Sequence, residues 1–216
     1  MDGDMRQKDD MVRAFGPGTR VLTDVVGDGK PHKMYLSHPE SGMSSILAPS
    51  ARHLAFFNGF PTFGRIERIE DVETCRLADI EELREIDFLR MDLQGAELMV
   101  LQNAGTALDR CVAIQCEASF IPLYEGQPTF GEIDLWMRAH GFLPHCFVEV
   151  KCWSIAPTIR NNDFRMPFNQ LLECDVVYVR GLVELGELSD MQLKKLILIA
   201  LYCYGSPDLA VHAESE

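Results

Sequence analysis

The stretch 86–97, Ile-Asp-Phe-Leu-Arg-Met-Asp-Leu-Gln-Gly-Ala-Glu, constrains the fold more than any other part of the chain. Its first six residues form a short, mostly apolar run, as a buried strand requires. Gly95 permits a tight turn, and the residues after it have the pattern of a helix. Such a strand–turn–helix predicts an α/β fold. It puts Asp92 and Glu97 at the carboxyl end of a strand, the edge where open α/β sheets bind their ligands.

These two acids also have a purely structural interpretation. A glutamate such as Glu97 in a first helical turn interacts favourably with the helix dipole, and Asp92 can cap the turn. Spacing alone therefore leaves a functional and a structural role open for both carboxylates.

The size and charge of the chain limit the classes of function. Its 216 residues, 47% of them hydrophobic, suffice for one α/β domain or for one domain with an appendage. The formal net charge of −13 argues against nucleic acid or a membrane surface as the main partner. No apolar run is long enough to span a bilayer, so we expect no membrane span. The first ten residues hold no apolar core of a secretory signal.

The cysteines indicate a reducing compartment, and we expect a cytoplasmic protein. Seven cysteines, an odd number, are scattered along the chain and suggest free thiols. A metal-dependent protein using His140, His145, Cys146 and Cys152 is a weaker alternative. The spacing of these four residues repeats no compact zinc pattern, so we assign no metal site.

Strand and helix patterns alternate along the chain, which predicts a mostly parallel sheet. An exposed or edge strand is expected over 65–75, and Glu117 directly follows an apolar run that ends at Cys116. The end of a helix is expected over 11–15. The remaining expected strands span 20–26, 33–37, 86–91, 111–116, 142–153 and 174–179, and the remaining expected helices span 77–83, 96–102, 130–140 and 191–204.

Two further segments carry candidate substrate contacts. Residues 49–64 hold four phenylalanines interrupted by glycine and proline, which predicts a packed loop or short helix. This cluster either packs in the core or a lid, or holds an aromatic or acyl substrate. Ser44 and Ser45 lie in a loop where they either present hydroxyls to a substrate or form a plain turn.

The segment IDFLRMDLQGAELMVLQNAG resembles the core DFLKIDVEGAELEVLKGAG of FkbM-type methyltransferases. Other segments resemble family motifs in the family's order and extend the similarity over residues 12–212. They are VLTDVVGDG at 21–29, GMSSIL at 42–47, IQCEASFIPLY at 114–124 and DVVYVR at 175–180. No one of these motifs is specific by itself, but their combination is.

The resemblance implies a class I (Rossmann-like) methyltransferase sheet that uses S-adenosylmethionine to methylate a hydroxyl of a small-molecule, sugar or lipid-like substrate. It implies that Asp92 is the acid after the fourth strand, beside the methyl donor. Glu97 corresponds to the acid of the family's GAE motif, and Glu117 to the acid after the fifth strand. Val25 and Val26 correspond to the positions on which the adenine ring packs. A carboxylate would accept or orient the hydroxyl proton.

Parts of the family pattern are absent from this sequence. There is no glycine turn of the type D-V-G-A-N-x-G, and Gln94 stands where the family has Glu. We therefore expect an incomplete sheet over 12–183 that lacks its first two strands, followed by a C-terminal helical segment and acidic tail over 184–216. Such a chain is expected to bind the cofactor weakly or not at all, and the sequence leaves open whether it is active on its own.

The alternative function is a non-catalytic interaction or binding protein built on a methyltransferase remnant. An incomplete sheet exposes edges and apolar faces. The expected partner is then a second copy of this chain, in a homo-oligomer, or another protein.

Overall fold

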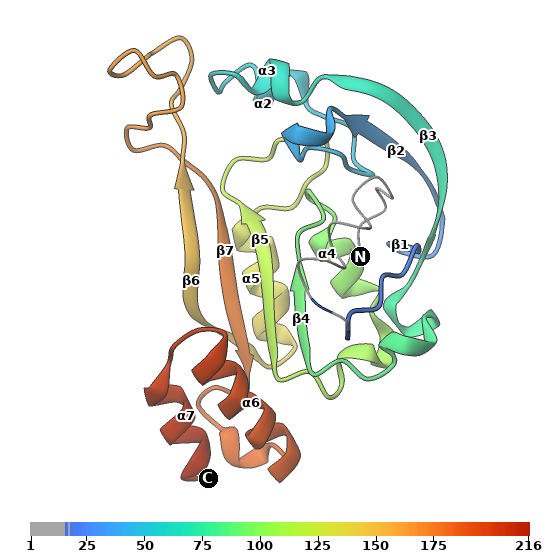
Figure 1. Cartoon of the computed structure of the whole chain (residues 1–216), viewed down its shortest axis with the longest axis vertical. Helices are drawn as coiled ribbons and strands as arrows, with labels where there is room; N and C mark the ends of the chain where they lie inside the picture. Colours follow the sequence, from blue (N-terminus) through green and yellow to red (C-terminus); the bar gives the residue numbers. More distant parts are fainter. Residues whose placement is uncertain (1–15, 17) are drawn as a thin grey trace.

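The computed structural model describes Gly16 and residues 18–216, which form two β-sheets with their helices (Figure 1). The helix end expected over 11–15 lies outside the described residues. The first sheet has the order β1-β3-β2, with β1 Val25–Val26, β2 Pro31–Ser37 and β3 Ile66–Cys75. The second has the order β4-β5-β7-β6, with β4 Phe88–Met91, β5 Ala113–Ser119, β6 Phe142–Cys152 and β7 Leu171–Arg180.

Both sheets are mixed, so the prediction of a mostly parallel sheet is wrong, although the α/β class is correct. Strands β4 and β5 pair in parallel, but β7 runs antiparallel to both of its neighbours. In the first sheet, β3 pairs in parallel with β1 and antiparallel with β2. Strands β6 and β7 follow one another through the loop 153–170 without a crossover helix, which permits the antiparallel arrangement. A strand that is buried on both faces has a similar composition whether it runs parallel or antiparallel to its neighbours. The sequence therefore did not reveal the direction of β7.

An exposed or edge strand was expected over 65–75, and β3 meets the first of these alternatives. It is the middle strand of its sheet, and most of its side chains are nevertheless exposed to solvent. The sheet curves around one side of the molecule (Figure 1), so one of its faces has no covering layer among the described residues.

Helices α4 Glu97–Gln102 and α5 Phe130–Ala139 pack against one face of the four-stranded sheet. Helix α5 begins with a capping box, in which Thr129 and Glu132 satisfy each other's backbone N–H groups. The buried residues between helices and sheet form the main core, which includes Val100, Ile114, Cys116, Ile133, Met137, Val176 and Tyr178.

Two helices at the C-terminal end of the chain, α6 Asp190–Tyr202 and α7 Pro207–Glu214, pack at the end of the sheet opposite to α2 and α3 (Figure 1). Ser189 caps α6 through a capping box with Gln192. The acidic tail is helical as far as Glu214, because Leu209, Ala210 and Ala213 are buried against α6 and the sheet. No helix in the described part of the chain is long and apolar enough to cross a membrane.

The phenylalanine-rich segment forms two short helices, α2 Ala51–Leu54 and α3 Phe60–Phe63, as expected. Phe57 and Phe60 are buried beside Tyr124 and Leu172, which supports the packing interpretation of this cluster. The helix expected over 77–83 is instead two 3-10 turns, Leu77–Asp79 and Glu81–Leu83. Three further 3-10 turns are Pro39–Ser41, Gly105–Leu108 and Leu185–Glu187.

Candidate active site at the carboxyl end of β4

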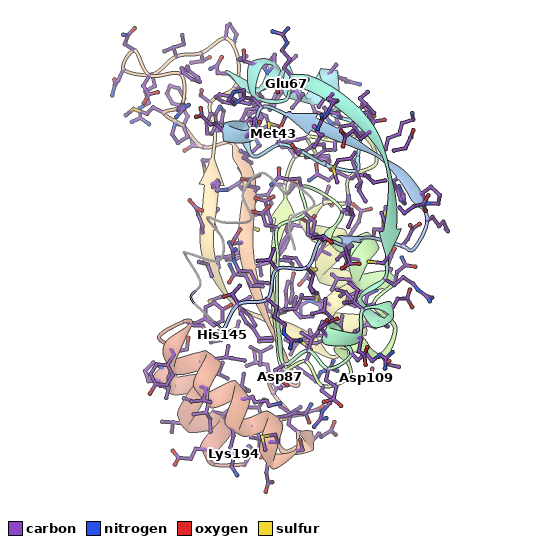
Figure 2. The ribbon with its side chains drawn as sticks, turned by 45° about the vertical axis from the view of Figure 1, so that its right-hand side comes forward. Met43, Glu67, Asp87, Asp109, His145 and Lys194 are labelled. Atoms are coloured by element: carbon purple, nitrogen blue, oxygen red, sulfur yellow. The ribbon has the colours of Figure 1, made fainter. Side chains whose placement is uncertain are left out.

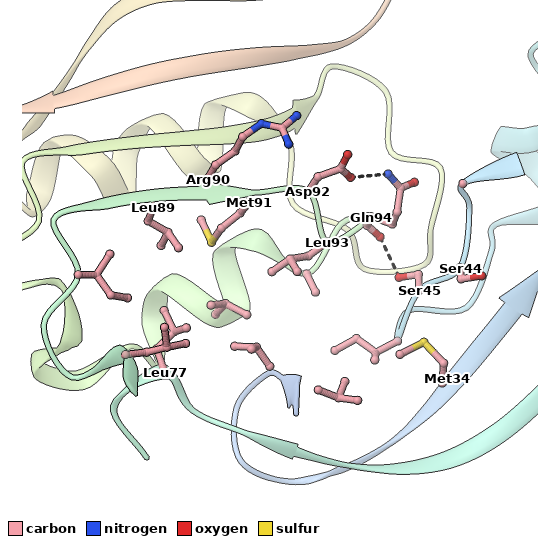
Figure 3. Close-up of a pocket in the computed structure, with 18 of the residues that line it drawn as sticks. Met34, Ser44, Ser45, Leu77, Leu89, Arg90, Met91, Asp92, Leu93 and Gln94 are labelled. Carbon is pink, nitrogen blue, oxygen red and sulfur yellow. Dashed lines mark hydrogen bonds between the residues drawn. The ribbon is translucent and has the colours of Figure 1, made fainter. Parts of the chain in front are cut away.

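A cavity of about 570 Å³ lies between β4 and the three-stranded sheet (Figure 3). Its walls are mostly apolar and come from both sheets and from the 3-10 turns between them. Its polar lining comes from Ser44, Ser45, Arg90, Asp92 and Gln94. This volume falls within the range of about 300–1,000 Å³ that is typical of small-molecule sites.

Five of the seven predicted site residues line this one cavity. They are Val25 and Val26 from β1, Ser44 and Ser45 from the loop after β2, and Asp92 at the end of β4. The fold therefore brings together the residues expected to contact the cofactor and those expected to contact the substrate. Glu97 and Glu117 do not line the cavity.

The turn between β4 and α4 orients the polar side chains. Gln94 has a φ of +50° and Gly95 a φ of +100°, both in the left-handed region. A Cβ at Gly95 would lie 3.0–3.1 Å from the side chain of Gln127, so glycine is required there for space as well as for conformation. Gln127 in turn accepts hydrogen bonds from the backbone N–H groups of Leu123 and Tyr124.

The carboxylate of Glu97 closes this turn. It accepts a hydrogen bond from the backbone N–H of Leu93 at 2.6 Å, and the residue is only 2% exposed. Burial raises the pKa of Glu97 to about 7, and the negative charge of Asp92 adds to the increase. These contacts correspond to the structural role that the sequence left open for this acid.

Glu117 lies inside β5, which continues to Ser119, so its expected position after the strand is wrong. Pairing with β7 extends β5 by three residues beyond the apolar run that ends at Cys116. Glu117 is almost fully buried, and burial together with the neighbouring Glu173 raises its pKa well above the ordinary range of a carboxyl group.

Lys151 on β6 is the cation of this part of the sheet. Its Nζ lies 2.7 Å from Glu173 Oε1 and 3.8 Å from Glu117 Oε1. Burial alone lowers the pKa of Lys151, but the carboxylates of Glu173 and Glu117 raise it above its ordinary value. The lysine therefore stays charged and offsets part of the negative charge around Glu117.

Gln94 connects the cavity to the buried acid. Its side-chain nitrogen donates to Asp92 Oδ1 at 2.8 Å and to Glu117 Oε2 at 3.2 Å. Its side-chain oxygen accepts from the Tyr124 hydroxyl at 2.9 Å. The Ser45 hydroxyl donates to the Gln94 backbone oxygen at 2.8 Å (Figure 3). The Gln94 amide therefore connects Asp92 at the cavity to the buried carboxyl group of Glu117.

Sequence reasoning did not assign Gln94, Tyr124, Lys151 or Glu173 to this site. The one sequence signal was at Gln94, where an amide stands in a motif that otherwise has an acid. Lys151 and Glu173 come from strands whose register the sequence does not reveal. The two serines of the cavity lining differ in accessibility, because Ser45 is buried while Ser44 is partly exposed.

The arrangement suits a reaction or a ligand with a positive charge. Asp92 is exposed at the polar end of a mostly apolar cavity. A carboxylate there can attract a cationic group and can accept a proton from a bound hydroxyl. Among Gly16 and residues 18–216, no three His, Cys, Asp or Glu side chains form a group that could hold a metal ion.

Comparison with known proteins identifies a family over more than half of the chain. Residues 19–144 match the family described as methyltransferase FkbM domain. This range contains β1 to β5, the cavity and the turn with Asp92 and Gln94. No curated protein and no solved structure matches the chain. The chain therefore belongs to the FkbM methyltransferase domain family.

Proposed function

We propose that this protein is an S-adenosylmethionine-dependent methyltransferase that acts on a hydroxyl oxygen of a small-molecule, sugar or lipid-like substrate. The observation that carries the proposal is the convergence of Val25, Val26, Ser44, Ser45 and Asp92 on one cavity of about 570 Å³. These residues come from three separate segments, and the family motifs contain all of them.

The cavity fits two parts of the methyl donor. Its apolar wall, which includes Val25, Val26 and Leu77, suits an adenine ring. The Asp92 carboxylate suits a sulfonium cation, since the two groups carry opposite charges. Gly42 is the one glycine in the cavity lining, and it belongs to no glycine-rich turn. We therefore expect the donor to bind weakly to the described cavity.

The protein's own residues have distinct tasks in this proposal. When bound, S-adenosylmethionine supplies an electrophilic methyl group. Asp92 stabilises positive charge and accepts or orients the proton of the substrate hydroxyl. Gln94 fixes the carboxylate of Asp92, and Ser44 offers a partly exposed hydroxyl toward the acceptor. When the methyl donor and the hydroxyl substrate are both bound and aligned, the transfer becomes effectively unimolecular, which raises its rate.

Glu97 and Glu117 hold supporting positions in the proposed site. Glu97 maintains the turn that carries Asp92, through its hydrogen bond to Leu93. Glu117 contacts Asp92 only through the Gln94 amide. A direct catalytic role for Glu117 would require its carboxyl group to reach the cavity after a change in the Gln94 side chain.

The proposal is tested with methyl-labelled S-adenosylmethionine and a panel of hydroxylated acceptors, including saccharides and acyl-chain alcohols. Transfer of label to an acceptor oxygen is expected, with at least one acceptor class clearly preferred. Absence of transfer to every acceptor, together with absence of donor binding, would favour the alternative of a non-catalytic interaction protein.

A further inference from the structure

The charge of this acidic protein is distributed unevenly. Two segments, 49–65 and 153–170, together contain four arginines and a single acid, Asp163. Their formal charge is therefore +3, in a chain whose formal net charge is −13. The arginines are Arg52, Arg65, Arg160 and Arg165. We name the surface formed by these two segments the basic rim.

The two segments of the basic rim pack against each other although about 100 residues separate them in sequence. The Asn58 side chain donates to Ser154 Oγ at 2.9 Å, and the Trp153 indole N–H donates to the Asn58 backbone oxygen at 2.8 Å. The rings of Phe60 and Trp153 meet edge to face, with centroids 5.1 Å apart. The rim is therefore one structural unit.

This unit is connected to the candidate site through a shared buried cluster. Figure 1 shows α2, α3 and the loop after β6 at the end of the sheet opposite to α6 and α7. Tyr124, which bonds to Gln94 in the site, packs in the same buried cluster as Phe57 and Phe60 of the rim.

Large apolar side chains on the rim are exposed next to the arginines. Ile159 is 58% exposed and Phe168 is 50% exposed, and Phe56, Ile155 and Phe164 are also exposed. The Arg160 guanidinium lies 5.2 Å from the centre of the Phe168 ring, and that of Arg165 lies 5.5 Å from the centre of Phe164. Among the residues that the structure describes, none of the four rim arginines forms an ion pair with a carboxylate.

We propose that the basic rim docks the protein on the surface of a bilayer that contains anionic phospholipids. The Arg160 guanidinium donates one hydrogen bond to the Pro167 backbone oxygen at 3.0 Å. The other N–H groups of the rim arginines bind phosphate groups, while the neighbouring apolar side chains enter the boundary between headgroups and acyl chains. The opposite charge of the rest of the protein orients it with the rim toward the membrane. This docking does not depend on methyl transfer.

The exposed aliphatic side chains favour a bilayer over a nucleic acid. Aromatic and arginine side chains can stack on bases, but Ile155 and Ile159 gain little from stacking. Burial of such side chains in an acyl-chain environment is directly favourable. Binding of an RNA to the rim is therefore the competing outcome of the test.

The test uses sedimentation of the purified chain with vesicles of phosphatidylcholine alone and with vesicles containing about one third phosphatidylglycerol. Binding is expected only to the anionic vesicles. The double variant Arg160→Gln/Arg165→Gln should bind roughly 25-fold more weakly, since each cationic side chain near the surface contributes a factor of about five. Ile159→Ser/Phe168→Ser should remove the binding that remains at high salt.

Two control variants separate charge at the rim from total charge and from loop structure. The variant Arg84→Gln/Lys194→Gln removes two positive charges outside the rim and should bind the vesicles as the parent does. Figure 2 shows Lys194 at the end of the molecule far from Met43 and Glu67. Arg160→Lys/Arg165→Lys keeps the charge and should retain binding. No binding to anionic vesicles, equal weakening by the Arg84/Lys194 variant, or tighter binding to a single-stranded RNA oligonucleotide would each overturn the proposal.

Discussion

The Tyr124 hydroxyl lies 2.9 Å from the side-chain oxygen of Gln94 and donates a hydrogen bond to it. Because the Asp92 carboxylate can only accept, the end of the Gln94 amide that faces it is the nitrogen, and the amide oxygen is left to accept from Tyr124. Tyr124 lies in the loop after β5, 30 residues from Gln94 in sequence. Its hydroxyl therefore helps to hold the Gln94 amide in the orientation in which the nitrogen contacts Asp92 and Glu117.

Replacement of Tyr124 by phenylalanine should lower the free energy of unfolding by about 1–3 kcal/mol, because buried acceptors at Gln94 and at the Met43 backbone lose their donor. Denaturant unfolding measures the change. Tyr202→Phe is the matched control, because Tyr202 is 82% exposed, and it should change the stability by less than about 0.5 kcal/mol. Equal effects of both variants would contradict this role of the Tyr124 hydroxyl.

Gly95→Ala should destabilise the protein more than Gly126→Ala. Both glycines have positive φ, so both variants introduce backbone strain of about 1–2 kcal/mol. Only at Gly95 does the new methyl group also meet a neighbour, the Gln127 side chain, whereas nothing lies within 4 Å at Gly126. Thermal unfolding of the two variants measures the difference, and a smaller loss at Gly95 would contradict the predicted clash.

Glu97→Gln should change how stability depends on pH. The folded-state pKa of Glu97 is raised from 4.5 to about 7, so the folded protein binds the proton more tightly than the unfolded chain. The protonated Glu97 carboxyl group therefore contributes to the free energy of unfolding below pH 4.5. This contribution, about 3 kcal/mol in total, is lost as pH rises from about 4.5 to about 7. The variant lacks this loss and should gain stability relative to the parent over that window.

Denaturant unfolding at pH 5 and pH 8 measures the effect of Glu97→Gln. The variant also keeps an oxygen that can accept the Leu93 N–H. Glu81→Gln replaces an exposed glutamate and serves as the control. A constant difference between Glu97→Gln and the parent at both pH values would show that this carboxyl group is not the cause.

Asp92→Asn should reduce methyl transfer by about 10²–10⁴-fold and leave the melting temperature unchanged, because the two side chains have nearly the same shape. The variant loses a negative charge and a proton acceptor at the end of the cavity. A purely structural cap tolerates asparagine almost as well as aspartate. Turnover at half the parent rate or more would assign Asp92 to that structural role and move the proposed catalytic carboxylate to Glu117 or Glu97.

The local elements of this fold were largely predictable from sequence, because their signals are local. The turn at Gly95 and the capping residue Ser189 have side-chain or backbone properties that act within a few residues. For the candidate cavity, the place of Asp92 was expected from the strand–turn–helix pattern, whereas Val25 was expected only from the resemblance to family motifs.

Strand direction and register were not predictable, because they depend on contacts between distant segments. The position of Glu117 inside β5 follows from its pairing with Asp175 of β7, and the ion pair of Lys151 with Glu173 follows from the β6–β7 register. The basic rim was hidden for the same reason. Its two halves are far apart in sequence, and the net charge of −13 conceals a local excess of arginine.

The most direct test of the central claim, that this cavity binds the methyl donor, is NMR of the protein labelled with ¹³C at its methionine methyl groups. Met34 and Met91 line the cavity, whereas Met137, which shares the main core with Met91, does not line it. Titration with S-adenosylmethionine should shift the Met34 and Met91 signals saturably, with an affinity weaker than the micromolar range, and S-adenosylhomocysteine should compete. Unchanged Met34 and Met91 signals at millimolar donor, or equal shifts at Met137, would contradict the claim.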